Sequence, residues 1–261
     1  MSDWLHSLPL PWMAFVIFGA AYVTAAAIGF IAMVLANVRC VRAFKGITAG
    51  ILSPLGTLFA LFVVFTAAQV WGDTDRANTA VIREASALRT VVILAARFPG
   101  EPDADLRRLV RRHIEEAAAQ EWPMMARHTE TLSVVPRHLA EAVQVALALA
   151  PANPGQEIAQ RGIYTALEDA LDARRQRIIV SLSQVSLAKW LCLSVQAACM
   201  LVAIAMLHCD NRGALAIASG LFASGVAVSI FLILAHDRPF TGEISVSPAP
   251  LLQVIPESPA R

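Results

Sequence analysis

The sequence has few charges for its size. Asp, Glu, Lys and Arg make up 16% of its 261 residues, whereas 57% of the residues are apolar, and the mean hydropathy is +0.58. Soluble domains carry about 25% charged residues, so this scarcity argues against a soluble protein. The formal net charge of +1 gives no reason to expect a nucleic-acid partner. Only two of the 21 basic residues are lysines, which, with the abundant alanine, is typical of a GC-rich bacterial coding genome.

Cysteine is scarce too, and its spacing excludes the usual metal and redox motifs. No Cys-x-x-Cys pair occurs among the four copies, all of which lie in or beside apolar segments. We interpret them as small apolar residues rather than as disulfide partners or metal ligands. They are Cys40, Cys192, Cys199 and Cys209.

Catalytic motifs are missing from the chain. There is no Gly-x-Ser-x-Gly, no His-Glu-x-x-His and no phosphate-binding loop. The pairs His208-Cys209 and His236-Asp237 lack a third partner at metal-ligand spacing. We therefore predict no enzyme activity, no catalytic residue, no cofactor and no metal site.

What the sequence does contain is long apolar runs. Four segments, at about 12–36, 51–71, 187–208 and 213–235, are each near the ~20 residues that a helix needs to cross a bilayer. The first lacks a basic segment before it and is too long for the core of a secretory signal, so we expect it to be retained. The pattern predicts an all-α membrane protein with four transmembrane helices in two hairpins.

A charged segment separates the two predicted hairpins. Residues 72–186 show helical periodicity, with an apolar seam at Val81, Ala85, Leu88, Val92 and Ala95. This segment predicts a helical extramembrane domain of four helices, and spans two and three continue into it. The domain boundaries expected are 1–71, 72–186, 187–235 and, for an extended C-terminal tail, 236–261.

The expected helix limits follow from capping and breaking residues. Ser53 and Pro54 predict the start of span two after a loop at 37–50. Asp103 is the expected N-cap of a helix that ends at Trp122. Two further helices are expected at 136–150 and 156–186, the last running into span three.

Small residues recur every fourth position in two spans. The stripe in span one predicts close packing against another helix, and a similar stripe in span four predicts the same. The two stripes are Ala21, Ala25 and Gly29, and Ala216, Gly220 and Ser224.

The orientation is not settled by the distribution of basic residues. Four basic residues lie in the short loops on one side of the four spans, and more lie near the span ends on the side of residues 72–186. The count favours a cytoplasmic central domain, but the rule is strongest for short loops. The four loop residues are Arg39, Arg42, Lys45 and Arg212.

Several motifs resemble those of the bestrophin-like family of bacterial membrane proteins, a domain family of unknown function. The most specific is the string that follows span four, with Thr241 where the family favours serine. The motifs are Glu84-Ala85-Ser86-Ala87-Leu88, Glu121-Trp122, Arg174-Arg175 and Asp237-Arg238-Pro239-Phe240-Thr241-Gly242. The family is distantly similar to bestrophins, which are pentameric anion channels.

The resemblance has implications for location and assembly. It implies a multi-pass protein of the bacterial inner membrane whose termini and residues 72–186 are cytoplasmic, and it implies a homo-oligomer. It also implies structural or partner-binding roles for the motif residues. From charge alone, Glu84 pairs with Arg174 or Arg175 or is solvated, and Asp237 and Arg238 tie the tail to the helical domain. Arg238 alternatively meets lipid headgroups.

One face of span two is a candidate pore lining. Six side chains lie within about 80° of one another around the helix and include most of the polar groups of the span. In the alternative, the phenylalanines face lipid or neighbouring helices and Thr66 bonds its own backbone. The six residues are Leu55, Phe59, Phe62, Thr66, Gln69 and Asp73.

Two functions from different classes remain open on the sequence. The first is an oligomeric, bestrophin-like ion channel with span two lining the pore. The second is a non-conducting membrane scaffold or sensor that binds a protein partner through its helical domain. The lipid bilayer is the environment expected in both.

Overall fold

The computed structural model describes residues 3–6, 8–35, 38–129 and 132–256, without the side chains of Asp3 and of residues 38–49. This described part is helical and contains no strand, so the all-α fold class is confirmed. Its elements are α1 (Asp3–His6), α2 (Leu10–Leu35), α3 (Val38–Ala95), α4 (Glu101–Glu116), a π-helix η1 (Ala117–Glu121), α5 (Trp122–Ala126), α6 (Arg137–Ala148), α7 (Pro154–Ser181), α8 (Leu187–His208), α9 (Arg212–His236) and α10 (Ala249–Leu252).

Four helical segments are long and apolar enough to cross a membrane. They are Leu10–Leu35, Gly50–Ala95, Leu187–His208 and Arg212–His236, and each contains or closely matches one predicted span. The second has 46 residues, which is about 69 Å of helix, whereas the hydrocarbon core of a bilayer is ~30 Å thick. Span two therefore continues beyond the membrane as one helix, as predicted.

The start of α3 differs from the prediction. Residues 38–50, expected as a loop, belong to this helix, so Ser53 and Pro54 lie inside it rather than at its N-terminus. Proline removes one backbone donor, which membrane helices tolerate because neighbouring groups satisfy the freed carbonyl. Asn37 and the side chains of Arg39, Arg42, Lys45 and Cys40 lie outside the described part.

The expected continuity between the helical domain and span three was wrong. Helix α7 ends at Ser181 and α8 begins at Leu187, with Ser186 at its N-cap position. The five intervening residues include two serines, whose hydroxyls compete with helical backbone bonds and favour helix ends. The N–H of Val185 donates to Asp237 Oδ1 over 2.6 Å, which gives this broken backbone a partner outside the helix.

Helix α4 begins two residues before the predicted cap. Its N-cap is Gly100, with φ 101°, a conformation that glycine adopts without steric cost. Asp103 lies in the first turn and accepts a bond from Arg107 Nε over 2.8 Å. A carboxylate there still favours the helix electrostatically because it lies near the positive end of the helix dipole.

The chain forms two compact units. We call the first the membrane unit; it comprises the described residues up to Gly72, Gln184–Asp237 and Gly242–Ile244. We call the second the helical unit; it comprises Asp73–Ser183, Arg238–Thr241 and the described residues from Ser245. Helix α3 contributes to both.

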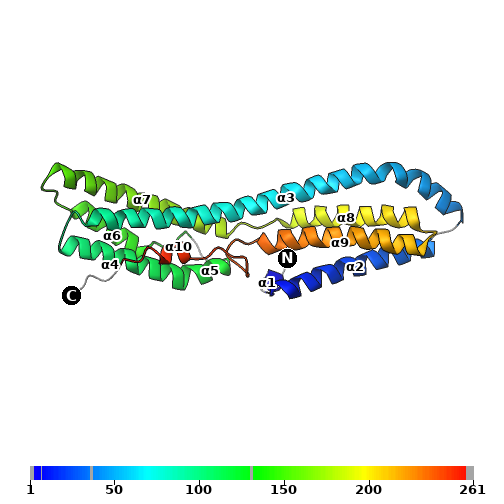
Figure 1. The fold of residues 1–261 in the computed structure, drawn as a ribbon, viewed down its shortest axis with the longest axis horizontal. Coiled ribbons are helices and arrows are strands. Elements are labelled where there is room, and N and C mark those ends of the chain that lie inside the picture. The colour runs from blue at the N-terminus through cyan, green and yellow to red at the C-terminus, as the bar shows by residue number, and fades with distance from the viewer. Residues whose placement is uncertain (1–2, 7, 36–37, 130–131, 257–261) are drawn as a thin grey trace. The chain divides into compact units, whose positions relative to one another are not determined.

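In the membrane unit, α2, α8 and α9 pack side by side (Figure 1). The stripe predicted in span one is part of this contact, since Ala25 and Gly29 are buried and a Cβ at Gly29 would lie 3.6 Å from Leu215. On α9, Ser224 meets the Tyr22 hydroxyl at 2.8 Å, whereas Ala216 is exposed. Spans one and four thus contact each other, and the pairing of spans one and two as a hairpin stays a prediction.

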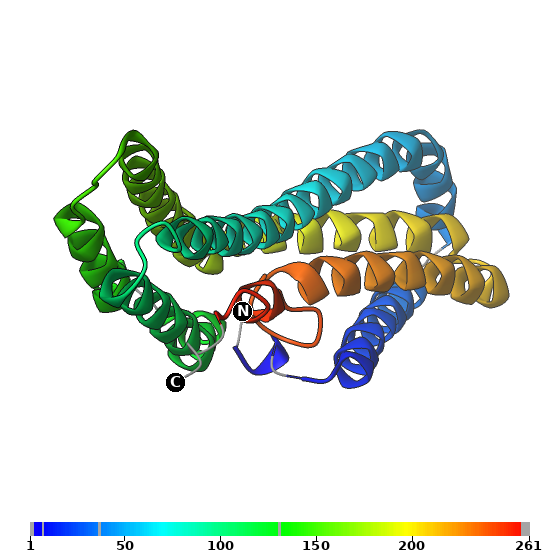
Figure 2. The same cartoon turned by 60° about the vertical axis from the view of Figure 1, so that its left-hand side comes forward.

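The helical unit is built on α3, α4, α6 and α7 (Figure 2). The predicted seam of α3 is buried except for the half-buried Val92, and it packs with apolar residues of the other three helices. The tail joins this core: Phe240, Val246 and Leu251 are buried in it. Composition predicted an extended tail, and packing gives its residues 238–241 and 245–256 a defined place within the helical unit.

Candidate functional site

The predicted pore face of α3 is covered within its own chain in the membrane unit. Phe59 is 9% exposed and its ring centroid lies 5.8 Å from that of Phe222 on α9. Thr66 is 3% exposed and donates to the carbonyl of Phe62 over 2.8 Å. Leu55 and Phe62 are half-buried.

The polar side chains at the C-terminal end of this face also accept hydrogen bonds within the chain. Gln69 Oε1 accepts a hydrogen bond from Lys189 Nζ at the start of α8. Asp73, which belongs to the helical unit, is buried and accepts from Arg76 over 2.6 Å. These contacts match the alternative interpretation of the face, so its role as a pore lining stays a prediction.

A neighbouring face of α3, centred about 90° around the helix from the predicted one, is exposed in the single chain. Leu58, Leu61 and Phe65 are 59%, 52% and 67% exposed. Thr57 is exposed beside them, and its hydroxyl donates to the Ser53 carbonyl over 3.0 Å. This face is therefore available to lipid, to another chain or to a conduit between chains.

The helical unit contains a buried ionic cluster, which we define as Glu84, His113, Glu121, Arg174 and Arg177. All five are at most 8% exposed. Arg177 donates from Nε to Glu84 Oε2 over 2.8 Å and from Nη2 to Glu121 Oε2 over 2.7 Å. Arg174 Nε donates to Glu121 Oε1 over 2.7 Å. Two carboxylates thus meet two guanidinium groups, and the charges balance when the imidazole is neutral.

The balance of charges keeps both carboxylates ionised. Burial alone would raise the pKa of Glu84, but the charge of Arg177 and the hydrogen bonds from His113 and Arg177 outweigh burial and lower the pKa to about 2. Burial also acts to raise the pKa of Glu121, and Arg177 and Arg174 lower it. Burial would lower the pKa of Arg177, whereas the two carboxylates raise it.

The imidazole of His113 also forms a hydrogen bond with Glu84. Its Nε2 lies 2.9 Å from Glu84 Oε1. An ionised carboxylate can only accept, so Nε2 carries the proton and donates. His113 is thus the satisfied interior histidine that its apolar neighbours Leu106 and Val110 indicate.

A π-helical turn places two members of this region. Segment η1 interrupts the helix between α4 and α5, and the wider i→i+5 turn brings the adjacent residues Glu121 and Trp122 both to the buried side. Such turns recur at functional sites. The resemblance motif Glu121-Trp122 is therefore the point at which the helix enters the cluster.

Trp122 links the cluster to the tail. The Arg177 guanidinium carbon lies 4.5 Å from the centre of the Trp122 ring, a cation–π geometry. Trp122 also contacts the tail. Its Nε1 donates to the Val246 carbonyl over 2.9 Å, and its ring packs edge-on against Phe240 with the ring centroids 5.7 Å apart. The tail motif and the helix motif are thus in direct contact.

The structure corrects the predicted partner of Glu84. Arg174 pairs with Glu121, and Arg175 is exposed and pairs with Asp172 three residues before it. Glu84 instead contacts Arg177 and His113. The sequence did not predict either of these partners. Periodicity carried a signal: Arg177 follows Arg174 by three residues on the same helical face as the buried Leu167 and Ala170.

Residues of the motif Asp237–Gly242 make contacts within both units. In the membrane unit, Asp237 is 4% exposed and Oδ2 lies 3.6 Å from His6 Nε2. In the helical unit, the Thr241 hydroxyl donates to the Ala126 carbonyl over 2.8 Å. Gly242 has φ 87°, which the left-handed region permits readily only to glycine.

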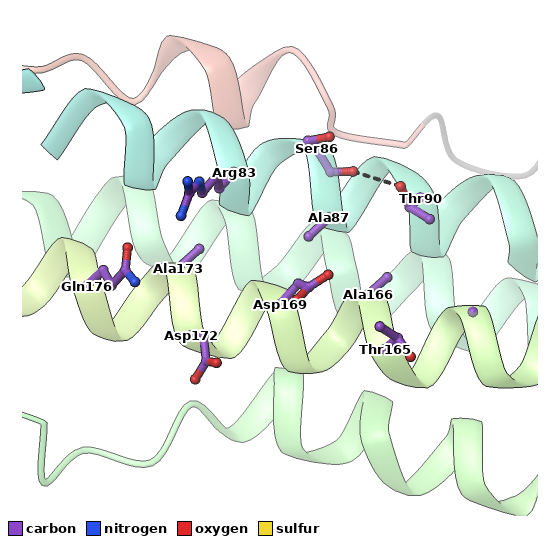
Figure 3. Close-up of a pocket in the computed structure, with 11 residues that line it drawn as sticks. Arg83, Ser86, Ala87, Thr90, Thr165, Ala166, Asp169, Asp172, Ala173 and Gln176 are labelled. Atoms are coloured by element: carbon purple, nitrogen blue, oxygen red, sulfur yellow. Dashed lines mark hydrogen bonds between the residues drawn. The ribbon is translucent and has the colours of Figure 1, made fainter. Parts of the chain in front are cut away.

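A polar groove runs along the surface of the helical unit between α3 and α7 (Figure 3). Its volume is about 700 Å³, and small side chains such as Ala87 and Ala166 form its floor. Thr90, on its rim, donates to the Ser86 carbonyl over 3.0 Å. In the described residues no group of three or more His, Cys, Asp or Glu side chains could hold a metal ion.

Comparison with known proteins gives the family. The model of the bestrophin-like domain matches residues 18–251. The chain belongs to the bestrophin-like family. No curated protein sequence is significantly similar to it.

Solved structures show the same fold for this bestrophin-like chain. Two crystal structures of single-residue variants of a bacterial bestrophin homolog from Klebsiella pneumoniae each match with a TM-score of 0.70 at 16% and 17% identity. The alignments cover 91% of this chain and 97% and 96% of those chains. A third crystal structure of that homolog matches with a TM-score of 0.67. The chain is accordingly a multi-pass membrane protein with a bestrophin-like fold.

Proposed function

We propose that the protein is an ion channel of the bacterial inner membrane, assembled from several copies of the chain with α3 of each copy along the conduit. The observation that carries this proposal is the exposed apolar face of α3. A helix that crosses the membrane and keeps one face uncovered by its own chain can line a space between chains. Membership of the bestrophin-like family supports the same function.

Two faces of α3 are candidates for the lining of the ion conduit. The predicted face at Phe59 and Thr66 packs on its own chain, so ions reach it only after α3 rotates away from α8 and α9. The exposed face at Leu61 and Phe65 needs no rearrangement. We propose that the exposed face lines the conduit, where rings of apolar side chains gate by excluding water.

In this proposal the termini and residues 72–186 are cytoplasmic and the loop at 209–212 is periplasmic. The abundance of basic residues near the span ends on the domain side supports this orientation. A cysteine placed at the exposed Ser133, in a chain whose own cysteines are replaced, tests it. Labelling by a membrane-impermeant maleimide in intact cells would contradict the orientation, and labelling only after lysis would agree with it.

Ion flux tests the channel itself. The purified protein is reconstituted into liposomes, and chloride and potassium flux are compared with those of empty vesicles. We expect flux above the empty-vesicle rate and an oligomeric mass in detergent. Flux equal to that of empty vesicles, together with a monomeric mass, would exclude the channel.

The second function is a non-conducting scaffold or sensor. The groove between α3 and α7 favours it, because a polar rim over a floor of alanines is a surface on which a partner helix can pack. Liposomes without flux and a partner that is recovered with the wild type, but not with Ala166→Trp, would favour this function.

A further inference from the structure

The membrane unit contains two apolar hollows along one groove between α2 and α8. The first, of about 310 Å³, is lined on these helices by Ile17, Ala21, Ala197 and Leu201, and α9 forms its floor. The second, of about 250 Å³, lies farther along the same two helices, at Ile28, Ala32 and Val202, and reaches Cys209 just after α8. The groove exists because small side chains face each other while α9 packs against both α2 and α8.

Polar side chains in these hollows donate their hydrogen bonds to nearby backbone carbonyls. Thr24 donates to the Ala20 carbonyl over 2.8 Å and Ser194 to the Trp190 carbonyl over 2.9 Å. Cys209 Sγ donates to the Met206 carbonyl over 3.2 Å. A lining without free polar groups does not hold water and takes hydrocarbon instead.

Length and volume fit acyl chains. The hollows extend from the level of Val16 to that of Leu35 on α2, which is about 28 Å of helix, close to the ~30 Å hydrocarbon thickness of a bilayer. A cavity of ~150 Å³ holds one benzene, so these hollows have room for about twelve and about ten carbons. Each hollow can therefore hold a large part of one acyl chain. One hollow lies at the depth of each leaflet of the bilayer.

The second hollow is open on the outer surface, and its last lining residue, Cys209, is followed closely in sequence by the exposed Asp210 and Arg212. Ile31, Leu35 and Val202, which line the second hollow, are 55%, 67% and 44% exposed on the outer surface. Arg212 follows Cys209 by three residues, is exposed and is the first residue of α9. A phosphate near this arginine is favoured by its charge.

We propose that this groove is a phospholipid site, in which one acyl chain occupies each hollow and the phosphate of the lipid beside the second hollow lies near Arg212. The site is independent of whether the protein conducts ions. It takes an anionic phospholipid of the bilayer, such as phosphatidylglycerol, as a bound component of the fold.

The first test counts lipids. Native mass spectrometry of the full chain released from detergent gives the number of phospholipids bound per chain in the wild type, Ala198→Phe, Ala32→Phe and Ala26→Phe. The first two variants fill one hollow each, and Ala26 is an exposed alanine of α2 outside both. We expect each filling variant to lose one lipid per chain and the control to lose none.

Two results would overturn the proposal. One is the same lipid count in all four proteins. The other is an unchanged lipid count with a reduced oligomeric mass in Ala198→Phe or Ala32→Phe, which would make the groove a contact between copies of the chain.

The second test does not depend on the folding of any variant. The delipidated wild-type protein is mixed with phosphatidylglycerol, and its thermal unfolding is followed by circular dichroism. A rise in Tm of several degrees that saturates near two lipids per chain is the expected result, because a ligand that binds only the folded state stabilises it. An unchanged Tm, or a rise that does not saturate, would overturn the proposal.

Discussion

Arg177 donates two hydrogen bonds to Glu84, which lies 93 residues earlier in the chain, over 2.8 Å and 3.2 Å. Both side chains are 0% exposed, so each charge is stable in the interior only because the other is present. This pair joins α7 to α3, the helix that continues from the second membrane span. The ion pair, with its neighbours Glu121 and His113, therefore adds a polar contact to the apolar seam that packs α3 within the helical unit.

Removing one partner of the pair should destabilise the helical unit strongly. Arg177→Met leaves two carboxylates buried with less compensation, and we expect a loss of about 3–5 kcal/mol in the free energy of unfolding. Thermal unfolding of the full chain in detergent, followed by circular dichroism, measures this loss. Arg175→Met is the matched control, because Arg175 is exposed. Equal effects of the two substitutions would contradict the role of the cluster.

The cluster should make stability depend on acid pH. The folded-state pKa of Glu84, about 2, lies below its ordinary value of about 4.3, so its stabilisation is present above that ordinary value and is lost as the pH falls towards 2. The full effect is about 3 kcal/mol. We expect the Tm to fall between pH 5 and pH 3, and to fall less in Glu84→Gln, which lacks the titrating group. Parallel pH profiles for the two proteins would show that other groups cause the loss.

The tail should depend on the indole N–H of Trp122. Trp122→Phe keeps an aromatic ring near Phe240 but removes the bond to the Val246 carbonyl. We expect a loss of about 1 kcal/mol and faster hydrogen exchange in residues 243–256, with little change in α6. Trp71→Phe, on an exposed tryptophan, serves as the control. Unchanged exchange in the tail would show that Phe240, Val246 and Leu251 hold the tail without this bond.

The two faces of α3 should respond differently in flux measurements. Leu61→Ser places a hydroxyl on the exposed face, and we expect it to raise ion flux in liposomes because a polar ring holds water more readily. Phe59→Ala removes a ring buried against Phe222. The cavity left behind costs about 3–5 kcal/mol in the free energy of unfolding, so we expect a lower Tm. We expect its change in flux to be smaller than that of Leu61→Ser. The reverse pattern, with flux altered by Phe59→Ala and Phe62→Ala but not by Leu61→Ser, would return the lining to the face predicted from sequence.

The sequence alone determined the elements whose signal is local. Apolar length gave the four spans, because crossing a bilayer imposes a minimum run that little else imitates. Helical periodicity gave the seam of α3, of which Val81, Ala85 and Leu88 are buried as expected. The motif ending in Phe240, Thr241 and Gly242 indicated the family without any structure.

Only the tertiary structure decided which charges are buried and which face of α3 is covered. Glu84 had three arginines within reach of a returning helix, and the choice of Arg177 depends on the rotation of α7, which the sequence does not state. Pro54 lies inside α3 rather than at its start because a membrane helix can continue through a proline. Phe59 and Leu61 are both apolar residues of one span, and the packing of α9 against Phe59 leaves Leu61 as the exposed one.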